Sequence, residues 1–108
     1  MTTTTQQLRT TVHVGLPSAD LAELVAIVAA HFEGATVTSA QGIWQGSTEP
    51  AALVTIIHPD GPSWAVRTDA LCRHLCSTLH QSCVLVTVEP VAAHTYAARA
   101  IHALADTY

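Results

Sequence analysis

The hydrophobic and polar positions of this 108-residue chain change their period several times. Residues 9–14 alternate, with Thr10, Val12 and Val14 on one side, as in a half-buried strand. After Pro17, apolar residues recur at helical spacing over residues 21–32. Ser18 is a candidate N-cap and Gly34 stands where a C-terminal cap is expected. The start of the chain therefore predicts a strand followed by an amphipathic helix.

The next part of the chain reads as two strands. Residues 36–44 combine β-prone types at strand spacing, and Gly42 and Gly46 are expected to interrupt them. Residues 45–50 are a polar connection. Residues 53–58 form a nearly continuous apolar run, which is typical of a central strand. The two segments predict a β-hairpin.

The last third begins with a turn at residues 59–62 (Pro-Asp-Gly-Pro). A second helix is expected from Ser63, with Leu71, Leu75 and Leu79 on its apolar stripe. Residues 84–88 predict a fourth strand, which Glu89-Pro90 is expected to close, and the alanine-rich segment from Ala92 predicts a C-terminal helix.

The predicted order is β-α-β-β-α-β with a tail helix. Right-handed crossovers then give an antiparallel four-stranded sheet with both helices on one face, which is an α+β ferredoxin-like sandwich. We expect residues 1–7 to be a disordered tail and residues 8–108 to form one domain.

Composition limits the partners. Only 11% of residues are charged, the formal net charge is −4, and the basic residues are four arginines with no lysine. Nucleic acids and anionic membrane surfaces are therefore poor partners. So low a charge density in a small domain suggests that other subunits cover the second face of the sheet. The N-terminus lacks the pattern of a signal peptide, so a cytoplasmic location is expected.

Several kinds of chemistry have weak support. Cys72, Cys76 and His80 recur at every fourth residue, and two or three of them could approach one metal ion. The cysteines also continue the apolar stripe of their helix, and we favour that structural interpretation and expect no metal. Cys83 follows the end of a helix, where a reactive thiolate is disfavoured. Phosphate-loop, dinucleotide-binding and serine-hydrolase motifs are absent from the sequence.

One group of residues is chemically suggestive: Gly42, Trp44, Gly46, Glu49 and Gln81. The glycines would let a ligand approach the backbone, and the tryptophan offers a stacking surface. Glu49 could bind an ammonium group or move a proton. The alternative is that Glu49 is a solvated hairpin residue and Trp44 a packing anchor, and residue types alone favour that alternative.

The segment from Leu79 to Val86 resembles the corresponding segment of the phage-encoded S-adenosylmethionine (SAM) lyases, which are small bacteriophage enzymes with a trimeric PII-like fold. Residues 42–45 (Gly-Ile-Trp-Gln) are similar to a glycine, any residue, tyrosine, basic residue segment of that family. Glu49 stands just before a strand, where the family carries a catalytic glutamate. The resemblance covers residues 40–98.

The resemblance implies a homotrimer with active sites between subunits and no cofactor. In the implied reaction, the methionyl carboxylate of SAM displaces the thioether, giving methylthioadenosine and homoserine lactone. Glu49 would engage the α-amino group, and backbone around Gly42 and Gly46 would line the pocket. Gln81 would be structural or would contact the ligand at a subunit boundary, and Trp44 replaces the family tyrosine. The alternatives are a non-catalytic PII-like module for a small nucleotide-like ligand and a purely structural oligomer.

Overall fold

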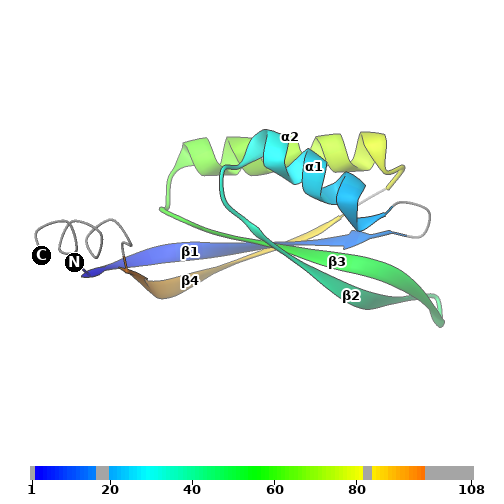
Figure 1. The fold of residues 1–108 in the computed structure, drawn as a ribbon, viewed down its shortest axis with the longest axis horizontal. Helices are drawn as coiled ribbons and strands as arrows, with labels where there is room; N and C mark the ends of the chain where they lie inside the picture. The colour runs from blue at the N-terminus through cyan, green and yellow to red at the C-terminus, as the bar shows by residue number, and fades with distance from the viewer. Residues whose placement is uncertain (1, 17–19, 82–83, 97–108) are drawn as a thin grey trace, which may run out of the picture.

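The structure is a computed structural model that describes residues 2–16, 20–81 and 84–96. The elements follow the predicted order (Figure 1). They are β1 (Thr2–Gly15), α1 (Leu21–His31), β2 (Thr36–Trp44), β3 (Ser47–His58), α2 (Pro62–Thr78) and β4 (Leu85–Tyr96).

The four strands form one sheet in the order β2-β3-β1-β4, and every neighbouring pair is antiparallel. Both helices lie on the same face of this sheet (Figure 1). The predicted ferredoxin-like α+β fold is therefore confirmed, with β1 and β3 as the central strands. The β2–β3 hairpin turns at one end of the sheet, and β1 begins and β4 ends at the other (Figure 1). Neither described helix is long and apolar enough to cross a membrane.

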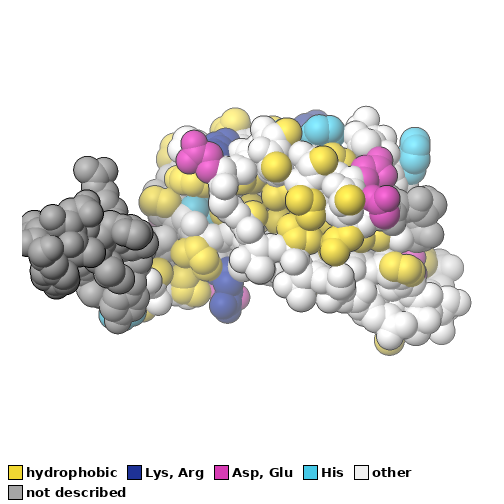
Figure 2. Space-filling model, in the orientation of Figure 1, with side chains coloured by type: hydrophobic (Ala, Val, Ile, Leu, Met, Phe, Trp, Pro, Cys, Tyr) yellow, Lys and Arg dark blue, Asp and Glu magenta, His cyan; other side chains and the backbone are white. Residues whose placement is uncertain are grey.

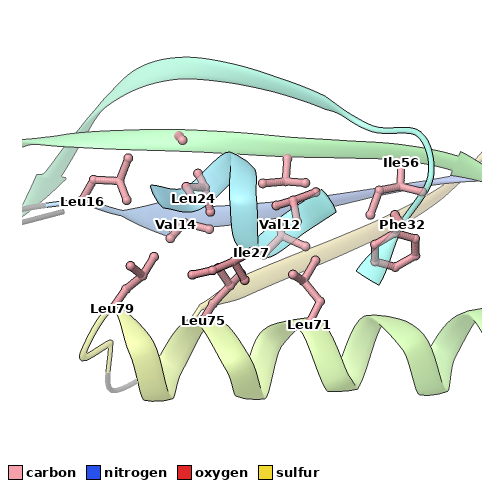
Figure 3. Close-up of a cluster of buried hydrophobic side chains, with 13 residues drawn as sticks. Val12, Val14, Leu16, Leu24, Ile27, Phe32, Ile56, Leu71, Leu75 and Leu79 are labelled. Carbon is pink, nitrogen blue, oxygen red and sulfur yellow. The ribbon is translucent and has the colours of Figure 1, made fainter. Parts of the chain in front are cut away.

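The core lies between the sheet and the helices. Leu71, Leu75 and Leu79 of α2 and its C-cap point from the helix toward the strands (Figure 3). They meet residues such as Val12 of β1, which is fully buried. Because side chains alternate along a strand, the buried positions of β1 and β3 are all even-numbered.

Neither described helix covers the other side of the sheet, and we call this side the open face (Figure 1). It carries the odd-numbered side chains of β1 and β3, together with the residues paired opposite them. Its members include Arg9, Thr11, His13, Gly15, Glu49, Ala51, Leu53, Thr55 and Ile57. Leu85, which pairs with His13, is 60% exposed there.

The first helix begins after Asp20, whose side chain accepts a 2.8 Å hydrogen bond from the Glu23 N–H. The N-cap is therefore Asp20, and the predicted cap, Ser18, lies outside the described residues. Leu21 and Val25 of the predicted apolar stripe stay partly exposed, and hydrophobic side chains gather over α1 on the face shown in Figure 2.

The hairpin differs from the sequence prediction. The polar connection expected over residues 45–50 is only the turn Gln45-Gly46, and β3 starts at Ser47. The turn is short because Gln45 and Gly46 both adopt positive φ, which suits a two-residue hairpin loop. Gly42 does not interrupt β2 but pairs regularly with Glu49.

The far end of the sheet also differs. Residues 2–7, expected as a disordered tail, belong to β1 because they pair with residues 91–96 of β4. Pro90 does not end β4: it pairs with Leu8 on an edge strand, where the missing N–H can face away from the sheet. Residues 92–96 are accordingly strand rather than helix, and the rest of the predicted C-terminal helix lies outside the described residues.

Candidate functional site

A concavity of about 210 Å³ lies on the open face near the β2–β3 hairpin. Three residues singled out from the sequence line it: Gly42, Trp44 and Glu49. His13, Gly15, Ala40, Ala51 and Leu53 contribute further side chains or backbone. The site therefore draws on three adjacent strands, β2, β3 and β1.

Strand register explains why this part of the sheet is hollow. Ala51 pairs with Gly15 on one side and with Ala40 on the other, so that small residues form one row across three strands. In the next row Glu49 pairs with Gly42. Because opposite residues project to the same face, these rows leave a floor of small residues beside the Glu49 carboxylate.

Gly15 is the residue on which the site converges. A Cβ atom placed on Gly15 would lie 2.8 Å from Glu49 Oε1 and 3.1 Å from Gln81 Oε1. The first distance is shorter than real Cβ contacts, so the glycine leaves the space that the two side chains occupy. Sequence reasoning missed Gly15, since a glycine at the end of a strand carries no visible signal of what approaches it.

The end of α2 places Gln81. His80 adopts a positive φ of 56°, and the Gln81 N–H donates to the Cys76 carbonyl at 3.1 Å, so that the chain turns sharply after the helix. The Gln81 amide donates a long hydrogen bond of 3.5 Å to the Leu79 carbonyl. Its oxygen is left facing Gly15. Gly15, Glu49 and Gln81, which are far apart in sequence, thus meet at one end of the sheet.

The structure places the other residues singled out from the sequence, Trp44, Glu49 and Gly46, in three different environments. Trp44 is 64% exposed, so it is not a packing anchor within the chain, and its ring is free to receive a ligand or another subunit. Glu49 is half-buried on a strand and is not a loop residue. Gly46 lies in the turn, with nothing within 4 Å of an added Cβ, and the lining of the concavity does not include it.

The charges around the concavity favour a cation. Its lining contains the Glu49 carboxylate but no lysine or arginine. Arg9, on the same face, is already held by Glu89 in a 2.7 Å ion pair. Two oxygen acceptors, those of Glu49 and Gln81, point toward the same place, and such a pair suits an ammonium group.

The cysteines of α2 form no comparable site. Burial raises the pKa of the Cys72 thiol, and Cys76 and Asp69 raise it further through like charge. A protonated thiol is a poor metal ligand and a poor nucleophile. Within residues 2–16, 20–81 and 84–96, no three His, Cys, Asp or Glu side chains are grouped closely enough to hold a metal ion. Cys83 lies outside the described residues.

Comparison by sequence gives no match, either to a protein-family model or to a curated protein. Comparison by structure does. A phage SAM lyase in complex with S-methyl-5'-thioadenosine is 18% identical, with a TM-score of 0.64 over 84% of this chain and 90% of that one. CPII, a nitrogen regulatory PII-like protein from Thiomonas intermedia K12, is 8% identical, with a TM-score of 0.58 over 89% and 100%. CutA from Synechococcus elongatus PCC7942 is 15% identical, with a TM-score of 0.56 over 94% of both chains.

At identities this low, the structural similarity shows the fold alone. The fold that the sequence resemblance implied is therefore confirmed: the chain has the PII-like form of the ferredoxin-like sandwich, and it shares that form with a phage SAM lyase.

Proposed function

We propose that this protein cleaves SAM to methylthioadenosine and homoserine lactone, at sites formed between the subunits of a homotrimer. The observation that carries the proposal is the convergence of the Glu49 and Gln81 oxygens over Gly15, beside the concavity that Gly42 and Trp44 line. The similarity in fold to a phage SAM lyase that holds S-methyl-5'-thioadenosine supports it.

The reaction needs no water and no cofactor. The substrate's carboxylate oxygen forms a bond to its own Cγ, and the bond from Cγ to the sulfonium sulfur breaks. The electron pair of that bond goes to sulfur, so that the positive charge disappears and a neutral thioether leaves. The enzyme's task is to hold the methionyl chain folded for in-line attack, and positioning of this kind supplies a large part of a rate enhancement.

The site residues divide this task. Glu49 holds the α-ammonium group with a charge-assisted hydrogen bond, and the Gln81 oxygen accepts a second one. Binding the ammonium group at this fixed point leaves the substrate's carboxylate free to turn toward Cγ. Trp44 provides a stacking surface for the adenine, and the small residues Gly42 and Ala51 let the chain lie against the sheet.

A second candidate is a non-catalytic PII-like module that binds a nucleotide. CPII, with the same fold, has been solved with ADP, AMP and bicarbonate. Nucleotide phosphates are normally held by arginine, lysine or a glycine-rich helix start. The lining of this concavity has a glutamate and no lysine or arginine, which favours the positively charged SAM over a nucleotide.

The trimer is proposed because one chain leaves the site open. Trp44 projects with 64% of its surface exposed, and Ile57 and Leu85 on the open face are also uncovered. Contact between the open faces of neighbouring subunits would bury these side chains and enclose the concavity. Native mass spectrometry should give the trimer mass. A monomer with full activity would contradict sites between subunits. Because SAM is made inside cells, the proposal includes a cytoplasmic location.

The activity test is direct. Purified protein is incubated with SAM, and methylthioadenosine and homoserine lactone are measured by mass spectrometry. We expect both products in equal amounts. Glu49→Gln should lose most turnover, whereas Glu33→Gln, which changes an exposed carboxylate outside the concavity, should not. A wild type that binds SAM or ADP in calorimetry but forms no product at high enzyme concentration would support the binding module instead.

A further inference from the structure

The core contains an unusual polar pair. Among the described residues, the buried polar side chains are Thr10 and His58, which are 2% and 5% exposed. They contact each other, with Thr10 Oγ1 and His58 Nε2 2.6 Å apart. Burying polar groups costs free energy unless they are hydrogen-bonded, and even a paired hydroxyl and imidazole add little to a core that apolar residues could fill. Stability alone therefore does not explain why Thr10 and His58 lie in the core.

Both residues line a second cavity, of about 260 Å³, which we call the His58 cavity. It lies between the sheet and the first turns of α2, on the helix side of the sheet and away from the hairpin that bears the concavity of Glu49. Leu8, Val86 and Val88 supply apolar wall from the sheet, and Trp64 and Ala65 supply wall from α2. A mostly apolar cavity with a few polar groups is the usual form of a small-molecule site.

The hydrogen bonds determine what the cavity offers a ligand. His58 Nδ1 lies 2.8 Å from the Pro59 carbonyl oxygen, which can only accept, so Nδ1 carries a proton. In the neutral imidazole Nε2 then accepts from the Thr10 hydroxyl, and Thr10 has only lone pairs left for a ligand. Thr68 is in the same state, because its hydroxyl donates to the Trp64 carbonyl at 2.8 Å. The Asp60 carboxylate also lines the cavity.

The aromatic wall is held in place before any ligand arrives. The Trp64 ring stacks on His58, with ring centroids 5.0 Å apart and planes at 19°. The Arg67 guanidinium lies 4.4 Å from the centre of the same ring, and it donates a 3.0 Å hydrogen bond to the His31 carbonyl. A wall fixed on both sides loses little conformational freedom on binding.

We propose that the His58 cavity binds a small aromatic molecule of one or two rings that carries an N–H or amino donor. Its volume is below the roughly 300–1,000 Å³ of drug-sized sites. It exceeds the ~150 Å³ of an engineered apolar cavity that holds benzene in another protein. The donor follows from the acceptor-only polar groups of Thr10, Thr68 and Asp60. This site is independent of the proposed lyase activity, and either can fail without the other.

The test compares two ligands of nearly equal shape. Indole has two rings and an N–H, and benzofuran replaces that N–H with an oxygen. The probe is the NMR signal of the tryptophan indole N–H groups, one from Trp64 and one from Trp44, assigned with Trp44→Phe. Indole should shift the Trp64 signal and leave the Trp44 signal in place. Indole should also bind about fivefold to tenfold more tightly than benzofuran, as one hydrogen bond of this kind implies.

Two variants locate the effect. Ala65→Leu puts a larger side chain on the cavity wall and should abolish the Trp64 shift. Ala70→Leu makes the same change at an exposed site of α2 outside the cavity and should preserve it. Both positions are on the surface of a helix, so both variants should fold. No Trp64 shift with millimolar indole, or a shift that survives in Ala65→Leu, would overturn the site, and equal affinity for benzofuran would overturn the donor requirement.

Discussion

Replacing Gly15 with alanine separates the geometry of the site from the stability of the fold. The new Cβ would meet Glu49 Oε1 at 2.8 Å and Gln81 Oε1 at 3.1 Å. Both atoms are the ends of flexible side chains, so the side chains should move and the backbone should not. We therefore expect Gly15→Ala to fold and to displace the Glu49 carboxylate from its place in the site.

The magnitudes follow from two opposing effects. Alanine in place of a glycine of ordinary φ stabilises by about 0.4–1 kcal/mol, and forcing Glu49 off its rotamer costs about 0.5–1.5 kcal/mol. The net change in unfolding free energy should stay within about 1 kcal/mol, which is roughly 4–8 °C in melting temperature for a domain of this size. Losing a hydrogen bond to a charged group removes about 1.5–3 kcal/mol, so kcat/KM for SAM should fall about 10- to 150-fold.

The matched control is Gly34→Ala. A Cβ on Gly34 would have no atom within 4 Å, and Gly34 does not line the concavity. This variant should keep kcat/KM within a few-fold of wild type. Methylthioadenosine formation, SAM affinity by calorimetry and thermal melts would be measured on both. A Gly15→Ala protein with wild-type affinity and turnover would refute the inference that Gly15 makes room for the site. A Gly15→Ala protein that does not fold would also contradict the reasoning, because only the ends of two flexible side chains should have to move.

Two further predictions concern the fold. Leu75→Ala removes a fully buried side chain of α2 and should lower the unfolding free energy, measured by urea titration, by about 2–5 kcal/mol. Val66→Ala, at a 67% exposed position of the same helix, should change it by less than about 0.5 kcal/mol. Equal losses in the two variants would contradict the position of the core described above. Because the pKa of Cys72 is raised, the thiolate fraction of this residue at pH 8 is below that of a free cysteine. Iodoacetamide should therefore label Cys72 more slowly in the native protein than in urea, and the difference between the two rates should decrease as the pH rises. Faster labelling of the native protein would contradict this prediction.

Periodicity predicted the architecture well because burial imposes it directly. The alternation of residues 9–14 and the helical recurrence of Leu71, Leu75 and Leu79 are both consequences of packing against one core. The errors lie where pairing with a distant segment decides the structure. Residues 2–7 and 92–96 are polar or alanine-rich, and each is a strand because the other is there to pair with it.

The site was only half predictable for the same reason. Trp44 and Glu49 were visible because their residue types are rare in this chain, and Gln81 because of a family resemblance. Gly15 and the pairing of Thr10 with His58 join residues that are far apart in sequence. A single chain carries no local mark of such contacts, since they depend on strand order and on the side chain across the sheet.

Strand β3 serves two purposes on alternate residues. Ala52, Val54 and Ile56 face the core, while Glu49, Ala51 and Leu53 face the concavity. Core packing and the shape of the concavity therefore depend on alternate residues of β3. Substitutions at the odd-numbered positions can change the lining of the concavity while the buried side chains of the strand stay the same. A library confined to residues 51 and 53, with Ala40 across the hairpin, would explore new ligands on a scaffold that still folds.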